Sequence, residues 1–247
     1  FFPYKYQTDE PWDQVLLTSI PKLHSASTEK GFHRALQQMV VKIDDAHGWF
    51  IAGKTNYKWP LFLTKYVEDR IVVRDFYKHP DSLKSPLKIG DVVLGIDGEH
   101  INEIISDNKP YMWGSNKGST YKNLKNFVII SPKAQKRRLK VLRGNDTVEV
   151  DVKYFSRDSL KPKKSKKWSL LSDSIGYVNM GKLTGKDVKI MMTSFRETRA
   201  IILDVRNYPK GALRKLASYL IPEERLFYKL IQPDLGYPGR FIWRDGS

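Results

Sequence analysis

Residues 200–211 read Ala-Ile-Ile-Leu-Asp-Val-Arg-Asn-Tyr-Pro-Lys-Gly, and this stretch decides the expected fold of the C-terminal third of the chain. Its apolar start is typical of a parallel strand that is covered on both faces. A Pro-Lys-Gly turn follows, and the next apolar residues have the spacing of one helix face: Leu213, Leu216, Ala217 and Leu220. A strand, a glycine turn and a helix start predict free backbone N–H groups at the carboxyl end of a sheet. Enzymes of the α/β class stabilise developing negative charge there.

The residues before this stretch predict a second strand and a helix. Residues 175–181, Ile-Gly-Tyr-Val-Asn-Met-Gly, have the composition of a strand, and residues 187–195 have that of a helix. The order strand, helix, strand, helix implies right-handed crossovers between parallel strands.

These two segments resemble serine peptidases of the carboxyl-terminal processing and tricorn group. The corresponding stretch of that family reads Leu-Asp-Leu-Arg-x-Asn-Pro-Gly-Gly, and an Ile-Gly-Tyr-Ile strand occupies the position of residues 175–178. The resemblance implies the first part of a ClpP/crotonase-like α/β core. It also implies that the backbone N–H groups of Lys210 and Gly211 form the oxyanion hole, with Lys210 at the first of the family's two glycines.

A β-rich region precedes this core. Residues 87–101 place a Gly-Asp turn before an apolar strand that ends at the hairpin signal Asp97-Gly98. Two alternating strands then flank residues 144–146, Gly-Asn-Asp. The region resembles a PDZ domain, whose signature is Leu-x-x-Gly-Asp-x-Ile-Leu-x-Ile-Asp-Gly. PDZ domains bind a peptide as an added strand and hold its terminal carboxylate on loop amides.

The PDZ resemblance places the peptide-binding loop at residues 59–63, so the peptide-binding residues are expected to be Leu61, Phe62 and Leu63. Trp59 and Pro60 stand where the family has a glycine-rich loop, and a proline removes one N–H donor. A purely structural lid is the alternative to peptide binding at this position.

The N-terminal region, residues 11–43, is predicted to be helical. Trp12, Val15, Leu16 and Ser19 form a short face before Pro21, and Ser27 or Thr28 is expected to cap a second helix. Residues 44–47, Asp-Asp-Ala-His, follow this helix. They resemble the Asp-x-His motif of the tricorn-like branch, which implies that His47 is the general base. Without the resemblance, His47 reads as a structural or surface histidine.

The nucleophile is the element that the sequence does not supply. The family places its serine in a Ser-Ala-Ser-Glu-like turn downstream of the oxyanion loop. Ser218 falls inside the expected helix and Ser247 falls at the end of the chain, so neither lies in such a turn. The sequence is therefore interpreted as a fragment of a serine endopeptidase that lacks its nucleophile and is inactive alone. The alternative is a catalytically degenerate peptide-binding protein with the same folds.

Composition narrows the classes of partner. Forty-three basic and 27 acidic residues give a net charge of +16, with a lysine run at residues 161–167. No nucleic-acid-binding motif accompanies these charges, so we interpret the run as a solvated linker and expect no nucleic-acid partner. The chain has no cysteine, no metal-ligand spacing and no apolar run of about eighteen residues, so no cofactor, metal or membrane span is expected. The expected partner is a peptide or an unfolded protein.

The predicted fold class is an α+β multidomain protein. It comprises an N-terminal helical region at residues 1–58, a PDZ-like domain at 59–155, a basic linker at 156–167 and a partial peptidase core at 168–247. A peptidase of this kind is expected to be exported, in the periplasm or cell envelope, with its signal removed. The sequence does not indicate an oligomeric state.

Overall fold

The computed structural model describes residues 8–50, 56–131, 133–172, 174–221, 223, 225–226, 229–237 and 239–244. The chain divides into two compact units, residues 2–163 and residues 164–247 with Phe1. Among the described residues, no helix is long and apolar enough to cross a membrane.

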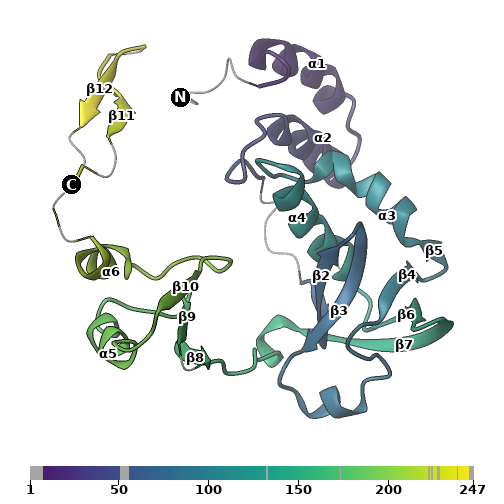
Figure 1. Cartoon of the computed structure of the whole chain (residues 1–247). Helices are drawn as coiled ribbons and strands as arrows, with labels where there is room; N and C mark the ends of the chain where they lie inside the picture. The colour runs from purple at the N-terminus through teal and green to yellow at the C-terminus, as the bar shows by residue number, and fades with distance from the viewer. Residues whose placement is uncertain are drawn as a thin grey trace. The chain divides into compact units, whose positions relative to one another are not determined.

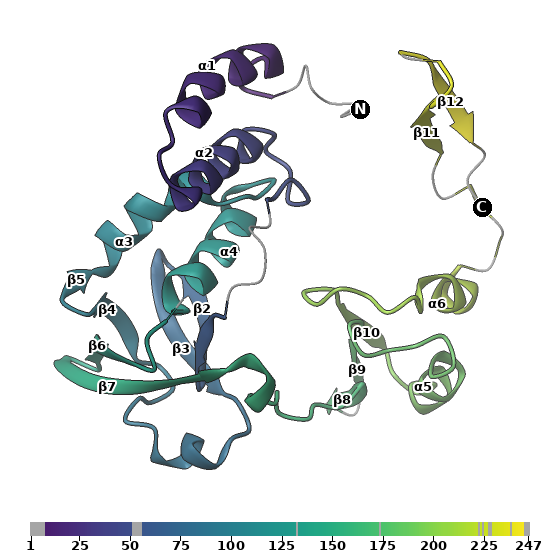
Figure 2. The same cartoon turned by 180° about the vertical axis from the view of Figure 1, so that it is seen from behind.

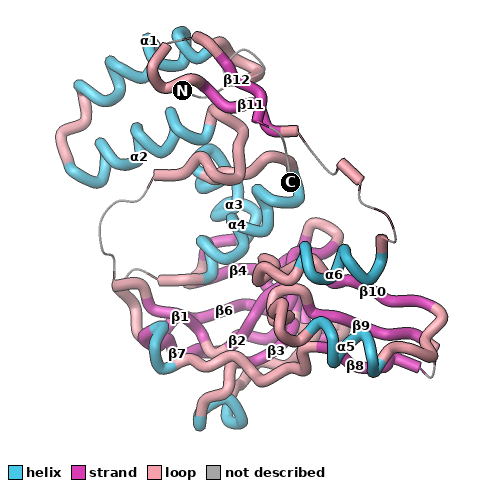
Figure 3. Tube along the Cα trace, turned by 90° about the vertical axis from the view of Figure 1, so that its left-hand side faces the viewer, coloured by secondary structure: helices cyan, strands magenta, loops and turns pink. Residues whose placement is uncertain are grey.

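The larger unit is a helix-covered antiparallel sheet (Figure 1). Its strand order is β1-β7-β6-β4-β3-β2, and the short β5 pairs with β4. Figure 3 shows α3 and α4 lying on one face of this sheet. The strands are β1 Lys58–Pro60, β2 Phe62–Val67, β3 Arg70–Phe76, β4 Val92–Ile96, β5 Glu99–His100, β6 Lys136–Arg143 and β7 Asp146–Ser156. The helices are α1 Trp12–His24, α2 Glu29–Val41, α3 Ile101–Asn108 and α4 Lys117–Ile129, with single 3-10 turns at Pro80–Lys84, Lys109–Tyr111 and Arg157–Ser159.

Both predicted hairpins of this sheet are confirmed. Asp97 and Gly98 connect β4 to β5 with φ angles of 54° and 90°, the left-handed values that an Asp-Gly turn accommodates. Gly144, at φ 60°, opens the turn between β6 and β7. Apolar side chains from the strands, α3 and α4 form one buried core, which includes Ile71, Leu124 and Leu139.

The N-terminal helices confirm the predicted cap of α2, and a proline lies inside α1. The Thr28 hydroxyl accepts a hydrogen bond from the Gly31 N–H at 3.0 Å, so Thr28 is the cap of α2. The short apolar face predicted before Pro21 belongs to α1, and the helix continues through Pro21 to His24. Pro21 lacks only the N–H that would bond to the Leu17 carbonyl, and Leu17 is exposed, so water can meet that carbonyl.

Contacts with α2 and the segment after it hold this helical layer to the sheet unit. The Gln37 side chain donates to the Tyr111 carbonyl at 3.1 Å, and the Arg34 guanidinium lies 4.4 Å from the Tyr111 ring centroid. Trp49 and Trp113 stack with their ring centroids 5.8 Å apart. The two views in Figures 1 and 2 show α1 and α2 on the far side of α3 and α4 from the sheet.

The smaller unit contains a three-stranded sheet with two helices (Figure 2). Its strand order is β10-β9-β8, in which β9 and β10 are parallel and β8 is antiparallel. The parallel pair confirms the predicted crossover. The elements are β8 Trp168–Ser172, β9 Ile175–Asn179, α5 Val188–Ser194, β10 Ala200–Asp204, α6 Leu213–Leu220, β11 Leu230–Pro233 and β12 Phe241–Arg244, the last two forming a separate hairpin.

The expectation that β10 is covered on both faces is wrong for the described residues. β10 is an edge strand that pairs only with β9, and the side chain of Ile202 is 46% exposed. Leu203 and Val205 are also exposed. An apolar run reports that a strand is suited to burial, but it does not reveal which segment covers it.

Candidate functional site

The carboxyl end of β10 is fixed by an ion-pair cluster around Asp204, whose side chain is buried. Arg206 forms two parallel bonds to this carboxylate, Nε to Oδ1 at 2.8 Å and a terminal nitrogen to Oδ2 at 2.7 Å. The Tyr177 hydroxyl on β9 donates to Oδ2 at 2.5 Å. These bonds, led by the one from Arg206, hold the pKa of Asp204 well below its usual range. Asp204 is therefore a charged anchor that joins the ends of both parallel strands.

The turn beyond this anchor contains the predicted oxyanion donors, and its two amides differ. Gly211 has a φ of +70°, which explains the glycine, and its N–H has no hydrogen-bond acceptor among the described residues. The Lys210 N–H donates to the Met180 carbonyl at 3.2 Å. The prediction of free N–H groups is thus wrong for Lys210 in this conformation, because the loop folds back onto the residue that follows β9.

The predicted general base, His47, lies in the turn that follows α2. Its side chain is 90% exposed, and its Nδ1 lies 3.1 Å from Oδ1 of Asp45. The same oxygen accepts the His47 backbone N–H at 2.8 Å. The backbone and side-chain bonds from His47 lower the pKa of Asp45. The neighbouring Ala46 N–H donates to the Ser115 hydroxyl at 2.8 Å, which ties this turn to the loop before α4.

This arrangement leaves the Nε2 atom of His47 directed away from its carboxylate partner. A histidine whose Nδ1 is held by a carboxylate has the orientation required of a general base that acts through Nε2. His47 and the Lys210–Gly211 turn belong to different compact units. The structure therefore describes the two parts of the predicted site separately.

The serines considered as nucleophiles remain without a supporting geometry. The Ser218 hydroxyl donates to the Lys215 carbonyl at 2.9 Å within α6, as an ordinary helical serine does. Ser247 lies outside the described residues. Among the described residues, no three His, Asp or Glu side chains are grouped so that they could hold a metal ion.

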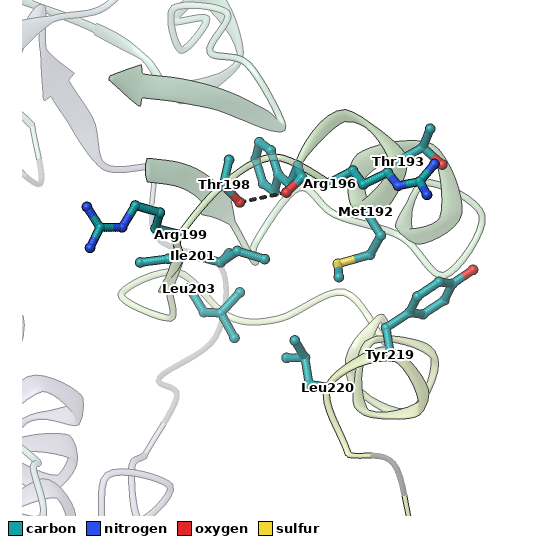
Figure 4. A pocket seen from close by; sticks show the side chains of 11 residues that line it. Met192, Thr193, Arg196, Thr198, Arg199, Ile201, Leu203, Tyr219 and Leu220 are labelled. Carbon is teal, nitrogen blue, oxygen red and sulfur yellow. Dashed lines mark hydrogen bonds between the residues drawn. The ribbon is translucent and has the colours of Figure 1, made fainter. Parts of the chain in front are cut away.

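The sequence did not predict a cavity of about 650 Å³ in the smaller unit. Figure 4 shows Met192 of α5, Ile201 and Leu203 of β10, and Leu220 of α6 around a common space. Tyr219, Arg196 and Arg199 also line it. The apolar sequence of β10 is the signal that could have indicated this cavity. Its residue Leu203 lines the cavity and stays partly exposed, as an apolar side chain does when no other layer packs on it.

The predicted peptide-binding loop is almost entirely strand in the structure. β1 ends at Pro60 and β2 begins at Phe62, so Leu61 alone separates them. Pro60 is tolerated because β1 is at one edge of the sheet. The side chains of Leu61 and Phe62 are buried and Leu63 is half-buried, so their backbone groups, rather than their side chains, are the groups that could meet a peptide. β2 is the opposite edge strand and pairs only with β3.

A sequence model of the PDZ domain family matches residues 59–175. The chain contains a PDZ domain. The matched range includes the antiparallel sheet from Trp59 onward, α3 and α4, which confirms the PDZ resemblance seen in the sequence, and it continues through β8 of the smaller unit. No curated protein matches the sequence.

Solved structures extend the likeness beyond the PDZ domain. The structure of mature CPAF complexed with lactacystin has a TM-score of 0.61 at 14% identity, over 88% of this chain and 54% of that chain. A mutant of CPAF has a TM-score of 0.63 at 13% identity, over 88% and 55%. The fold of these proteins is therefore shared, and the chain spans about half of their length.

A photosystem II D1 C-terminal processing protease is also similar, at 11% identity over 79% of this chain and 54% of that chain. Its TM-score of 0.35 is too low to support an argument about fold.

Proposed function

We propose that this chain is part of a serine endopeptidase and supplies its oxyanion turn, its general base and a peptide-binding PDZ domain. The observation that carries the proposal is the end of the parallel pair β9–β10. There, the Asp204 anchor is followed by a left-handed Gly211 turn that leads into α6. Backbone N–H groups at such a turn are suited to stabilising the negative oxygen of a tetrahedral intermediate. The motif resemblance at residues 175–178 and 200–211, which implies a ClpP/crotonase-like core, supports the same assignment.

In this proposal the Gly211 N–H is one oxyanion donor and the Lys210 N–H is the second. The Lys210 amide must then exchange its bond to the Met180 carbonyl for one to substrate. That exchange makes the turn a two-state element, closed as described here and open when the acyl oxygen is bound. His47 acts as general base through Nε2, while Asp45 orients its ring.

The nucleophilic serine is proposed to come from a segment outside residues 1–247. The fold neighbours support this assignment because the chain covers only about half of each. The open edge of β10 and the cavity beside it give such a segment an apolar surface to cover. We also propose that the whole protein acts outside the cytoplasm, on peptides or unfolded proteins.

Labelling of the complete gene product with a fluorophosphonate tests the assignment. We expect the complete protein to be labelled and residues 1–247 alone to remain unlabelled. His47→Ala should lower the labelling rate by roughly two orders of magnitude or more, because it removes the base that activates the serine. The control is His24→Ala, which removes an exposed histidine from α1. Labelling that is unchanged by His47→Ala would remove this histidine from the mechanism.

A second candidate function is that of a peptide-binding protein without catalysis. The observation that favours it is the engaged Lys210 amide, together with a lysine where the peptidase family has a glycine. On this alternative, the complete protein binds peptides but resists fluorophosphonate, and Lys210→Gly does not restore labelling.

A further inference from the structure

The PDZ domain carries an unpaired strand edge beside a basic helix. β2 is the last strand of the sheet, and α4 packs against it. Figures 1 and 2 show the two elements next to each other. An unpaired edge presents backbone N–H and C=O groups that an extended peptide can pair with. α4 contains three lysines and no acidic residue, so a peptide added at this edge would lie beside positive charge.

Two contacts show how α4 runs along this edge. Near the start of the helix, Tyr121 stacks on Tyr66 at the end of β2, with ring centroids 4.5 Å apart. Beyond the end of the helix, Ser131 and Lys58 exchange backbone hydrogen bonds of 2.7 and 2.9 Å beside β1. The helix therefore runs antiparallel to β2. Lys125 is one turn beyond Tyr121, which places it over the first half of β2.

A β-bulge brings a second cation to the same place. Leu63 pairs with Asp75 and Thr64 pairs with Val73, so Arg74 is the extra residue of β3 at this step. Bulged residues have redirected side chains. Arg74 interacts electrostatically with Lys125, and Lys122 does so from the preceding turn of α4. Three cations from two elements therefore lie close enough to repel one another beside the first half of β2.

None of these three cations forms a direct ion pair within the described part of the chain. The Asp75 carboxylate, which attracts Arg74 electrostatically, has its Oδ1 atom bonded to Lys163 at 2.6 Å and to the Phe76 N–H at 2.8 Å. The Lys125 ammonium donates only to the neutral Asn126 side chain, at 2.7 Å. Burial, followed by repulsion from Arg74 and Lys122, lowers the pKa of Lys125 to about 8. A desolvated ammonium among like charges is stabilised when a carboxylate arrives.

We propose that the β2 edge selects extended peptide segments carrying acidic side chains, and that Lys125 and Arg74 hold one such carboxylate. This inference rests on the proposed peptide-binding function and names the class of peptide. A side-chain carboxylate is favoured over a chain terminus for two reasons. Pro60, the last residue of β1, supplies no N–H donor where a terminus would be held, and a peptide with several acidic side chains matches three cations better than the single charge of a terminus does.

Fluorescence anisotropy with matched peptides on the whole 247-residue chain tests the selection. The probe is an acetylated, amidated octapeptide of alternating Val and Glu with a rhodamine label, and Gln replaces Glu in its partner. We expect the Glu peptide to bind about tenfold more tightly, the effect of one good charge-assisted contact. Lys125→Gln and Arg74→Gln should each remove most of this preference. Lys140→Gln removes the same charge from an exposed position on β6, three strands away, and should retain it.

The location of the bound peptide needs a separate readout. Because the chain has no cysteine, Lys65→Cys on β2 accepts a single environment-sensitive fluorophore, and Lys140→Cys provides the control. Addition of the Glu peptide should change the fluorescence at position 65 and leave it unchanged at position 140.

The outcomes separate this inference from the proposed function. Equal binding of both peptides would leave peptide binding intact and overturn the acidic selection. Absence of binding by either peptide would overturn the acidic selection and the peptide-binding role of the PDZ domain, whereas fluorophosphonate labelling of the complete protein tests the peptidase assignment independently. A preference for a free terminal carboxylate, with none for Glu over Gln, would assign the cations to a chain terminus and contradict the proposal. Displacement of the peptide by a short single-stranded oligonucleotide at lower concentration than by unlabelled peptide would assign them to polyanions and would also contradict it.

Discussion

The two compact units of this chain differ in how completely they bury their own sheet. The PDZ-containing unit surrounds a core of sixteen buried residues with strands on one side and helices on the other. The smaller unit, about half as long, has a core of eight buried residues among those described, but it leaves β10 exposed along one edge. The sheet of the first unit is therefore covered on its core face by its own helices, whereas the β10 edge of the second has no cover among the described residues. The strands of both sheets are regularly paired, yet the two sheets differ in how far their apolar side chains are covered.

The largest expected effect is on a buried ion pair in the PDZ-containing unit. Arg143 binds the buried Asp91 carboxylate through two bonds of 2.9 and 2.7 Å. Arg143→Ala leaves this charge buried and unpaired, which should lower the free energy of unfolding by about 3–5 kcal/mol. The matched control, Arg138→Ala, removes an exposed partner of Asp151 and should cost less than about 1 kcal/mol. Urea unfolding measures the loss of free energy of unfolding in both variants. Equal losses would contradict the burial of the Asp91–Arg143 ion pair in this unit.

A smaller effect is expected at the turn of the open unit. Gly211 and Gly185 both have space for a methyl group, but only Gly211 has a left-handed φ, at +70°. Gly211→Ala should therefore cost about 1 kcal/mol, while Gly185→Ala should be neutral or slightly stabilising. Limited proteolysis under native conditions reports on local opening of this turn. Similar protection of the two variants would show that the turn conformation is not held as described.

The smallest expected effect is a dependence of the stability of the smaller unit on pH. The Asp187 carboxylate binds Lys167 at 2.7 Å and the Thr184 hydroxyl at 2.7 Å, and its pKa falls to about 2. The unfolded carboxyl, with a pKa of about 3.9, binds more protons than the folded one between about pH 4 and pH 2. The contribution of the Asp187 carboxylate to folding stability is therefore complete above that pH window and declines as the pH falls through it. Asp187→Asn should flatten the decline in thermal midpoint, and an unchanged slope would exclude the contribution.

Local signals explain which elements were predictable from the sequence. Asp97, Gly98 and Gly144 define hairpins because these positions have positive φ, which Asp and Gly tolerate, and the alternating strands beside them fix the register. The cap at Thr28 and the parallel pair β9–β10 follow from equally local patterns.

The remaining features depend on tertiary context. The apolar run of β10 predicts burial, but its cover is not encoded in the run itself. The Lys210 amide looks free in sequence because its acceptor, Met180, is thirty residues away. The same holds for the cation cluster. Arg74 and Lys125 are fifty-one residues apart, and only the bulge in β3 and the antiparallel course of α4 bring them together.

The open edge of β10 has a practical consequence for any preparation of these residues alone. Exposed apolar strands such as Ala200–Asp204 pair readily with copies of themselves, which leads to aggregation. The net charge of +16 opposes such encounters at low ionic strength, and added salt weakens that protection. The solubility of the isolated chain should consequently depend on the balance between electrostatic repulsion and pairing along the open edge of β10.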